Sequence, residues 1–506
     1  MADRPNLLIL MADQLTARVL RSYGGATART PHIDALADAG VVFESFYCNS
    51  PLCAPSRFSF LAGQLPSRIG AYDNAAEYPA QVPTFAHYLR RAGYQTALAG
   101  KMHFCGPDQL HGFEDRLTTD IYPSDFGWTP DWTAFDKRPS WYHSMDSVIH
   151  AGACTRTNQI DFDDEVVVAA RQKLFDLARS RDRRAFCLVV SMTHPHDPYV
   201  IPHFYWSRYR DEEIELPRVP DLAGREDPHS RRLRHVIGLD LATPTESQVR
   251  AARRAYFGAV SYIDDQIGSL VATLKQAALD ANTVIVVLAD HGDMLGERGL
   301  WYKMNFYEPA CRIPLIVHAP GRFAARRMAA PASLLDLLPT FAALAGDGVP
   351  PEYAMPIDGT SLLPALEGGG APSGEVIGEY LAEGAIAPVV MVRRGHYKFV
   401  HSPVDPDQLY DVNADPDECV NLAGQADCAK VAADFRSEVA RRWDLSALHE
   451  AVLDSQRRRH FVYAALREGR FTPWDFQPLR DASRLYIRND QSLEEKEDLA
   501  RFPRLI

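Results

Sequence analysis

The segment around Cys53 has residue types and a spacing that suit the binding of an anion. It reads Ser-Pro-Leu-Cys-Ala-Pro-Ser-Arg over residues 50–57. Pro55 and the apolar spacing after it predict a helix that ends at Gly63. Cys53 would then lie at the helix N-terminus, where unpaired backbone N–H groups and the helix dipole favour negative charge. Arg57, one turn further along, would brace the same anion. By its position alone, Cys53 also fits a free cysteine buried as a small apolar side chain.

Short apolar runs elsewhere in the chain end in side chains that bind metals or carry protons. The ends of four such runs are Asp13, Lys101 with His103, His194 with His196, and Asp290 with His291. Runs that are apolar on both sides are typical of strands buried in a parallel or mixed sheet. In open α/β sheets, ligands bind beyond the carboxyl ends of the strands. If the four runs share one sheet, two carboxylates, three or four imidazoles and a lysine meet in one crevice. The alternative is that each run ends in an ordinary cap that faces solvent.

The pattern around these runs predicts an α/β architecture for the first part of the chain. Apolar runs alternate with helix-like stretches through about residue 345, and a Pro/Gly-rich linker covers residues 346–374. Short strands with tight turns follow from residue 378, which predicts a small antiparallel sheet. We therefore divide the chain into a catalytic domain, 1–370, and a C-terminal subdomain, 371–506.

The C-terminal subdomain is expected to hold helices and an extended tail. Helix-like segments cover residues 428–442 and 446–468, and the tail begins at Phe471. Because this tail has Pro and aromatic residues but little regular periodicity, we expect it to wrap over another surface, its own or a neighbouring subunit's.

Composition narrows the class of protein and of partner. The 506 residues are 46% hydrophobic and 24% charged, as in an ordinary globular protein. No apolar run approaches the roughly 18 residues of a membrane span. The net charge of −12 argues against a nucleic-acid partner, which needs a basic face. The N-terminus passes directly into an apolar run without a leader pattern, which predicts a cytoplasmic protein. The eight scattered cysteines are expected to be reduced.

The spacing Cys-x-Pro-x-Arg, together with the order of the other motifs, resembles the type I sulfatases. These enzymes are the formylglycine-dependent branch of the alkaline-phosphatase superfamily. The resemblance covers nearly the whole chain, through the segments 12–14, 30–37, 93–103, 194–199 and 290–303 as well as the cysteine motif. It implies an alkaline-phosphatase-like large mixed sheet sandwiched by helices, with a smaller antiparallel-sheet subdomain.

The resemblance also implies the cofactors. The cysteine of the motif, Cys53, would be oxidised to formylglycine by a separate formylglycine-generating enzyme. Its hydrated aldehyde has two hydroxyls on one carbon: one attacks sulfur, and the other later loses its proton so that sulfate leaves by C–O cleavage. A divalent metal would polarise the sulfate. Its implied ligands are Asp13, Gln14, Cys53, Asp290 and His291.

The metal ligands depart from the family pattern at two positions. Gln14 stands where many sulfatases have a second acidic residue, and His291 stands where Asn is frequent. An amide oxygen still coordinates, so we expect weaker metal affinity without loss of activity; the alternative is that Gln14 only accepts or donates a hydrogen bond. Hard oxygen ligands favour Ca²⁺ or Mg²⁺, and an imidazole makes Mn²⁺ tolerable.

The family's sulfate-binding side chains map onto five positions. They are Arg57, Lys101, His103, His196 and Lys303. His103 would orient or deprotonate the spare hydroxyl. Either His196 or Lys303 would protonate the leaving oxygen, and His194 is expected to be structural.

Within the family, the chain is most similar to the choline sulfatases. The similar stretches are 51–57, 71–77, 101–114, 126–132, 486–489 and 501–504. A quaternary ammonium has no N–H to donate, so aromatic faces and carboxylates recognise it. Trp128 is the expected aromatic residue, with Asn74 and His143 near it by resemblance. Glu379 or Glu383 would supply the negative charge, and Asp490 would reach a neighbour's pocket if subunits exchange their tails.

The expected substrate is therefore a small sulfate ester, choline-O-sulfate, and the expected assembly is a homo-oligomer, a tetramer or a dimer. Three alternatives stay open. One is an aryl or other alkyl sulfatase, and the second is a phosphonate or phosphate ester hydrolase of the same superfamily. The third is a non-catalytic relative that binds sulfate or choline.

Overall fold

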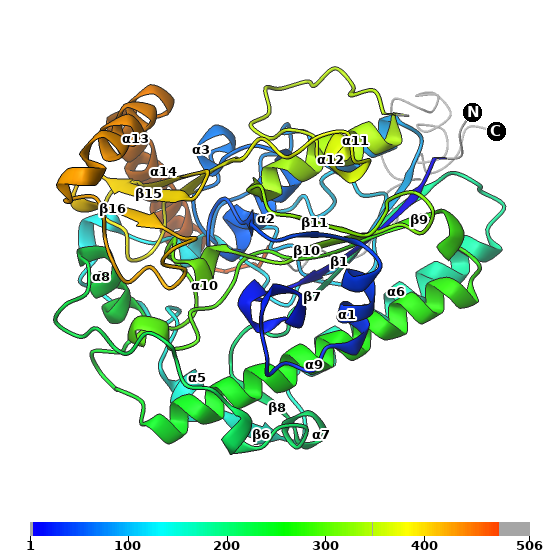
Figure 1. Ribbon diagram of the computed structural model, residues 1–506. Helices are drawn as coiled ribbons and strands as arrows, with labels where there is room; N and C mark the ends of the chain where they lie inside the picture. The colour runs from blue at the N-terminus through cyan, green and yellow to red at the C-terminus, as the bar shows by residue number, and fades with distance from the viewer. Residues whose placement is uncertain (1–3, 347, 475–506) are drawn as a thin grey trace, which may run out of the picture.

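An eight-stranded mixed sheet between two layers of helices forms the centre of the computed structural model, which describes residues 4–346 and 348–474 (Figure 1). The strand order is β11-β2-β10-β9-β1-β7-β4-β5. The parallel strands in its middle are β1 (Asn6–Ala12), β4 (Gln95–Gly100), β7 (Phe186–Met192) and β9 (Thr283–Ala289). Because these strands are parallel, their carboxyl ends lie along one edge of the sheet. They are the four apolar runs of the sequence, so the predicted fold class is confirmed.

Mixed pairing occurs at the margins of this sheet. β10 (Leu315–His318) is antiparallel to β9 and to β2 (Val41–Phe43), whereas β11 (Arg326–Met328) is parallel to β2. At the other edge, β5 (Asp115–Arg116) is parallel to β4. Every residue of β7 and β9 is buried, as expected for strands covered on both faces.

Helices cover both faces of the sheet. On one face lie α1 (Pro31–Asp38), α6 (Asn158–Arg179) and α9 (Glu246–Gln276); on the other lie α2 (Cys53–Ala62), α4 (Phe85–Arg91) and α11 (Leu337–Ala345) (Figure 1). Thr157 and Thr245 start the two longest helices of the first layer, each accepting a hydrogen bond from the backbone N–H of the third helical residue.

A second, four-stranded antiparallel sheet follows the linker. It consists of β13 (Glu375–Tyr380), β14 (Val389–Arg394), β15 (Tyr397–Ser402) and β16 (Asp405–Asp411). α13 (Ala429–Arg442) packs on β14 and β15, and α14 (Leu445–Leu466) returns to the main domain to contact η3 (Phe126–Trp128). The small sheet and both helices agree with the sequence prediction. Asp490 and most of the tail lie outside the described residues.

Shorter elements connect these parts. The remaining strands and α-helices are β3 (Phe46–Tyr47), α3 (Pro66–Ile69), α5 (Asp146–Ile149), β6 (Gly152–Cys154), β8 (Val200–Pro202), α7 (His203–Trp206), α8 (Pro228–Val236), α10 (Glu308–Cys311), β12 (Ala332–Ser333) and α12 (Leu363–Leu366). The remaining 3-10 helices are η1 (Ala17–Val19), η2 (Arg21–Tyr23), η4 (Trp132–Ala134), η5 (Asp211–Glu213), η6 (Asp280–Asn282), η7 (Glu297–Gly299), η8 (Leu334–Asp336) and η9 (Ala426–Cys428).

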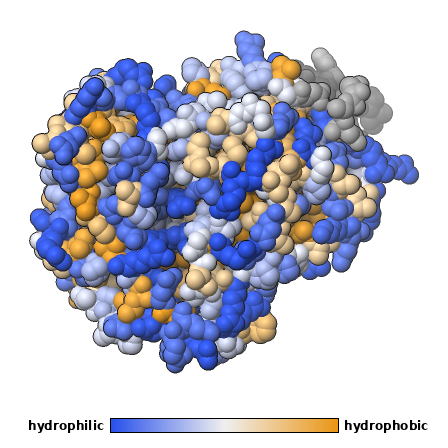
Figure 2. Space-filling model, in the orientation of Figure 1, coloured by the Kyte–Doolittle hydropathy of each residue, from blue (hydrophilic) through white to orange (hydrophobic). Residues whose placement is uncertain are grey.

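Within residues 4–346 and 348–474, none of the helices has both the length and the apolar character to cross a membrane. On the face shown in Figure 2, hydrophobic residues occur in small groups among hydrophilic ones. All eight cysteines are free.

Candidate active site

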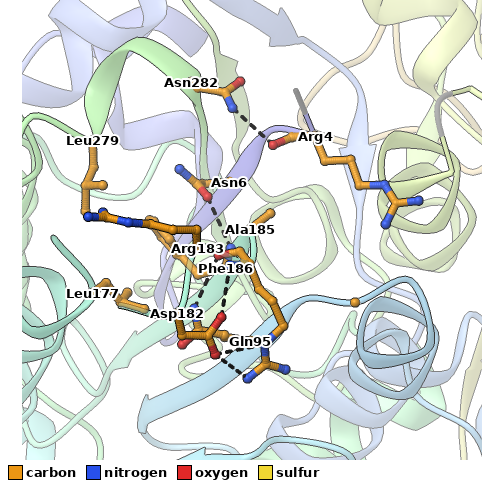
Figure 3. A pocket seen from close by; sticks show the side chains of 12 residues that line it. Arg4, Asn6, Gln95, Leu177, Asp182, Arg183, Ala185, Phe186, Leu279 and Asn282 are labelled. Atoms are coloured by element: carbon orange, nitrogen blue, oxygen red, sulfur yellow. Dashed lines mark hydrogen bonds and ion pairs between the residues drawn. The ribbon is translucent and has the colours of Figure 1, made fainter. Parts of the chain in front are cut away.

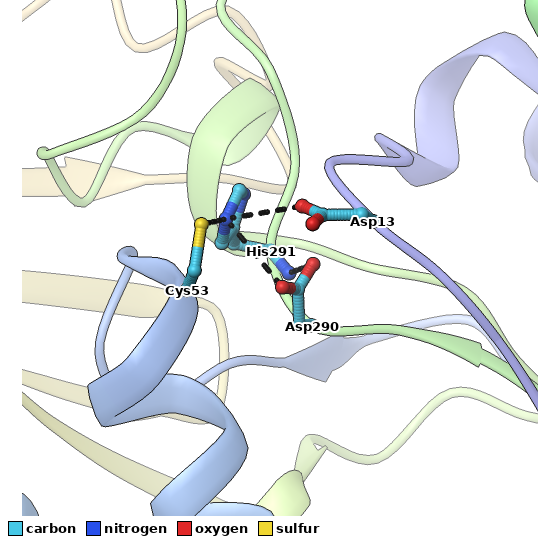
Figure 4. A group of neighbouring side chains, drawn as sticks. All are labelled: Asp13, Cys53, Asp290 and His291. Carbon is cyan, nitrogen blue, oxygen red and sulfur yellow. Dashed lines mark hydrogen bonds and ion pairs between the residues drawn. The ribbon is translucent and has the colours of Figure 1, made fainter. Parts of the chain in front are cut away.

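Three segments that are far apart in sequence bring potential metal ligands together at the carboxyl edge of the sheet. Asp13 follows β1, Asp290 and His291 follow β9, and Cys53 is the first residue of α2 (Figure 4). The potential ligand atoms of these four residues all lie within 4.8 Å of one another, and all four residues are buried. The predicted convergence is therefore observed.

The hydrogen bonds of His291 prepare one ring nitrogen for a metal. Nδ1 lies 3.0 Å from the carbonyl oxygen of Gly292, to which it donates, so in the neutral imidazole the lone pair is on Nε2. Nε2 lies 3.3 Å from Cys53 Sγ and 3.6 Å from Asp290 Oδ2. Within the described part of the chain, buried Asp13 Oδ1 has no hydrogen-bond partner. Two carboxylates, one of them with an unsatisfied buried oxygen, and an imidazole fit a divalent cation.

Arg57 supports the carboxylates of this cluster. Its Nε lies 2.9 Å from Asp290 Oδ2 and its Nη2 3.3 Å from Asp13 Oδ2. Nη1 donates to the carbonyl oxygen of Lys101 at 2.6 Å and to Ser191 Oγ at 2.8 Å. The described contacts of Arg57 therefore position the candidate metal ligands; the expectation that Arg57 also braces a bound anion stays a prediction.

Positive charge surrounds Cys53. Lys101 forms an ion pair with Asp13 and lies 3.5 Å from Cys53 Sγ. Burial alone would raise the pKa of the Cys53 thiol, but the charges of Lys101, Lys303 and His291 outweigh burial and hold the pKa well below its usual value. The same field would stabilise any anion bound at the start of α2.

His103 is available to a ligand. Its imidazole is buried, and neither ring nitrogen has a hydrogen-bond partner among the residues that the structure describes. The backbone has a positive φ of 64° here. It is anchored by Asp120 Oδ2, which accepts the N–H groups of Met102 at 2.9 Å and of His103 at 2.7 Å. No motif identified Asp120, because it acts on the backbone from an irregular segment.

Lys303 and His196 form a hydrogen-bonded pair beside the cluster. His196 Nδ1 lies 2.7 Å from the carbonyl oxygen of Asp197, to which it donates. His196 Nε2 is therefore an acceptor, and it lies 2.9 Å from Lys303 Nζ and 4.0 Å from Cys53 Sγ. In this arrangement Lys303 carries the proton that the pair can deliver.

Gln14 belongs to the network of Lys303. Its Oε1 accepts from Lys303 Nζ at 2.6 Å, and its Nε2 donates to Asp293 Oδ2 at 2.7 Å. Both amide atoms of Gln14 therefore form hydrogen bonds, which is the alternative to metal coordination. Metal coordination by Gln14 stays a prediction. His194 instead contacts Asp163, with 2.6 Å between Nδ1 and Oδ2, as expected of a structural residue.

The residues predicted to bind the substrate cation divide into two groups. Trp128 lies beside the site, with 5.7 Å between its ring centroid and that of His103. The ring of His143 is 5.8 Å from that of His196 and stacks on Tyr302 at 4.4 Å. Asn74 accepts the backbone N–H of Ala54, in the first turn of α2, at 2.9 Å. These three residues therefore lie around the site, beside His103, His196 and the first turn of α2 respectively.

Glu379 is not brought to the site, which corrects one prediction. Its carboxylate accepts hydrogen bonds from Ser67 N–H at 2.9 Å, Ser67 Oγ at 2.7 Å and Trp443 Nε1 at 2.6 Å. Both carboxylate oxygens of Glu379 thus form hydrogen bonds that join α3 to the end of α13. Glu383 stays the candidate carboxylate, and its charge interacts with those of Lys303 and Cys53. Burial, reinforced by the charge of Asp73, raises the pKa of Glu383 to about 7.

Tyr122 is a site residue that the sequence did not reveal. Its ring lies 4.5 Å from Lys101 Nζ, 5.7 Å from the ring of His196 and 6.2 Å from that of Trp128. A single tyrosine in an irregular segment gives no periodic or motif signal, so only the tertiary contacts identify it.

A separate pocket of about 450 Å³ lies at the other end of the strands (Figure 3). It is lined by residues at the starts of β1, β4 and β7, among them Asn6, Gln95 and Phe186, and by Arg4 and Arg184. It contains no member of the Cys53 cluster and lies opposite the edge where α/β sheets bind ligands.

Comparison with known protein families agrees with this geometry. A family model described as sulfatase matches residues 5–347, and a model described as choline sulfatase enzyme C terminal matches residues 450–502. A third, described as N-sulphoglucosamine sulphohydrolase, C-terminal, matches residues 296–444.

Individual relatives point the same way. The chain is 48% identical to a choline-sulfatase of Rhizobium meliloti (strain 1021), over 99% of each chain. It is 30% identical to the iduronate 2-sulfatase of Mus musculus, over 70% of this chain and 71% of the relative. Among solved structures, a phosphonate monoester hydrolase from Silicibacter pomeroyi superposes with a TM-score of 0.67 at 24% identity, covering 86% of this chain and 94% of the other. This last likeness supports the fold alone.

Proposed function

The chain belongs to the sulfatase family, and from that premise we propose that it hydrolyses choline-O-sulfate to choline and sulfate with a nucleophile made from Cys53. The observation that carries the proposal is the buried cluster of Asp13, Cys53, Asp290 and His291 at the start of α2, with Lys101 beside it. The full-length similarity to a choline-sulfatase and the position of Trp128 support the choice of substrate.

We propose that Cys53 is oxidised to formylglycine by a formylglycine-generating enzyme, as is general in the family. At residue 53, formylglycine would supply as its hydrate two hydroxyls on one carbon, one to act as the nucleophile and one whose deprotonation would let sulfate leave. Asp13, Asp290 and His291 would hold a divalent cation, with Ca²⁺ the first candidate, and the cation supplies Lewis-acid polarisation of the sulfate. Arg57 fixes the two carboxylates through its contacts to both.

The other side chains act on charge and on protons. Lys101 and Lys303 neutralise the negative charge on the sulfuryl oxygens. His103, whose two ring nitrogens are unpaired in the described structure, takes a proton at the side chain of residue 53. Lys303 donates a proton to the leaving oxygen, because the tautomer of His196 makes Nε2 an acceptor.

The role of Lys303 predicts a dependence on the leaving group. Lys303→Ala should lower kcat for choline-O-sulfate by about 100-fold to 1,000-fold, since loss of a general acid removes that much. With 4-nitrophenyl sulfate the loss should be about tenfold, because nitrophenolate leaves without protonation. Steady-state kinetics on both substrates measures this, and exposed Lys430→Ala is the control. Equal losses on the two substrates would show that Lys303 does not protonate the leaving oxygen.

Glu383 predicts a pH dependence of substrate binding. Its carboxyl is neutral below its pKa of about 7 and negative above it, so attraction to a quaternary ammonium grows as the pH rises. KM for choline-O-sulfate should fall from pH 6 to pH 8, whereas KM for 4-nitrophenyl sulfate should not show this fall. Glu383→Gln should remove the difference between the substrates. A choline-O-sulfate profile that is unchanged in Glu383→Gln would assign the effect to another group.

The proposed function is tested by a panel of three substrates. Protein produced together with a formylglycine-generating enzyme should hydrolyse choline-O-sulfate with a higher kcat/KM than 4-nitrophenyl sulfate or phenyl phosphonate. Chelation of divalent cations should abolish turnover, and added Ca²⁺ should restore it. A preference for the phosphonate would identify a phosphonate ester hydrolase, and a preference for the aryl ester would identify another sulfatase. Cytoplasmic location and homo-oligomerisation stay predictions.

A further inference from the structure

One stripe of α14 contacts the segment that carries Trp128. The stripe consists of Gln456, Arg459, His460 and Tyr463, spaced i, i+3, i+4 and i+7 so that they share one helix face. Gln456 and Arg459 are buried. On another side of the same helix, Phe461 is 75% exposed. The stripe is therefore the face of α14 that packs against the rest of the protein.

Three members of the stripe hold the chain on both sides of Trp128. Gln456 Oε1 accepts the backbone N–H of Trp132 at 3.0 Å, and His460 Nε2 donates to the carbonyl oxygen of Pro130 at 3.2 Å. On the other side, the ring of Tyr463 lies so close to Gly127 that a Cβ there would be 2.7 Å from it. A Cβ at residue 127 would displace Tyr463 or the side chain of Asp125, so the segment before Trp128 packs directly on α14.

The fourth member reaches the other wall of the site. Arg459 forms a bidentate ion pair with Asp73, with distances of 2.5 and 2.6 Å, in which both side chains are buried. Asp73 precedes Asn74, which accepts the N–H of Ala54 in the first turn of α2. One helix face thus fixes both the Trp128 segment and the turn next to the nucleophile helix.

We propose that α14 is a specificity-determining element, which positions the aromatic wall for the quaternary ammonium group of the substrate. The inference rests on the proposed function and adds to it the reason why the C-terminal segment matters. The segment matched by the choline sulfatase C-terminal model begins at residue 450 and includes the whole stripe. An aryl sulfate presents the same sulfate to the Cys53 cluster but has no cation, so it does not need this wall.

Two substitutions in the stripe test the proposal. Arg459 is not substituted, because its removal would leave the buried charge of Asp73 unpaired. Tyr463→Ala and His460→Ala should each raise KM for choline-O-sulfate by about tenfold, since a displaced aromatic face loses its cation–π contact. For 4-nitrophenyl sulfate, kcat/KM should stay within about twofold of wild type, because the Cys53 cluster is untouched. Tyr463→Phe keeps the ring and should behave like wild type.

Matched controls lie on the exposed side of the same helix. Phe461→Ala and Arg457→Ala should change neither substrate's kinetics. Gly127→Ala approaches the same contact from the opposite side and should reproduce the KM effect, so the test survives if a stripe variant does not fold. An unchanged KM for choline-O-sulfate, or equal losses on both substrates, overturns the proposal. Failure of the proposed function is distinct, because wild type itself would then not prefer choline-O-sulfate.

Discussion

Cys53→Ala should lower turnover of every sulfate ester by about 10⁵-fold to 10⁶-fold, the size of effect seen when a covalent nucleophile is removed. The physical reason is that the side chain of residue 53 supplies the nucleophile at the centre of the site. Its side chain lies at the N-terminus of α2, 3.3 Å from His291 and 3.5 Å from Lys101. The remaining cations would still attract the sulfate, but no side chain there would supply the hydroxyl that attacks sulfur. Steady-state kinetics on choline-O-sulfate and 4-nitrophenyl sulfate gives the loss.

Cys53→Ser separates attack from release. A serine has one hydroxyl on its Cβ, so it can accept a sulfuryl group but has no second hydroxyl to expel it. We expect a burst of no more than one turnover and, by intact-protein mass spectrometry, a protein heavier by one sulfuryl group. Exposed Cys419→Ser is the control and should leave turnover unchanged. Multiple turnovers by Cys53→Ala, or by wild type with an unmodified thiol, would refute the assignment of the nucleophile.

Trp128→Ala should raise KM for choline-O-sulfate by about 10-fold to 30-fold and leave 4-nitrophenyl sulfate much less affected. A desolvated cation–π contact is worth about 2 kcal/mol, and each 1.4 kcal/mol corresponds to a factor of ten. The ring lies 5.7 Å from His103 and 6.2 Å from Tyr122, so its removal opens the wall beside the Cys53 cluster. We expect the change in KM and not in kcat. The aromatic contacts of Trp128 in the structure are with His103 and Tyr122, and not with Asp13, Cys53, Asp290 or His291.

Trp128→Phe provides the matched control, since it keeps an aromatic face of smaller size. Its KM for choline-O-sulfate should lie between those of wild type and Trp128→Ala. Competitive inhibition by choline should weaken in parallel with the rise in KM, which ties the effect to the cation and not to the sulfate. If Trp128→Ala loses activity equally on both substrates, the tryptophan has a structural role and does not select the substrate.

Much of the site was predictable because its residues stand directly after local signals. The apolar runs that became β1 and β9 predict strands, and Asp13 and Asp290 follow their ends. Pro55 lies in the first turn of α2, and Gly63 caps it with a positive φ of 62°. Such features depend on a few neighbouring residues. The parallel arrangement of β1, β4, β7 and β9 then places the ends of these four strands on the same edge.

The details that sequence reasoning missed depend on contacts between distant segments. Glu379 and Glu383 are close in the chain, yet Glu379 accepts hydrogen bonds from Ser67 and Trp443, while the charge of Glu383 interacts with those of Lys303 and Cys53. Arg57 contacts both carboxylates of the cluster, a role that the sequence did not predict. Local pattern carries no information about these partners, because each choice is decided by which side chain arrives from another part of the fold.

By itself, the sequence determined the fold class, the family, the cysteine at the start of a helix and the set of polar groups at the strand ends, since these follow from hydrophobic periodicity, helix signals and motif spacing. Only the tertiary structure placed Lys303 beside His196, engaged Glu379 with Ser67 and Trp443, and brought α14 against the Trp128 segment. Hydrogen-bond partners and burial set proton positions and pKa values, and both exist only once segments hundreds of residues apart have packed together.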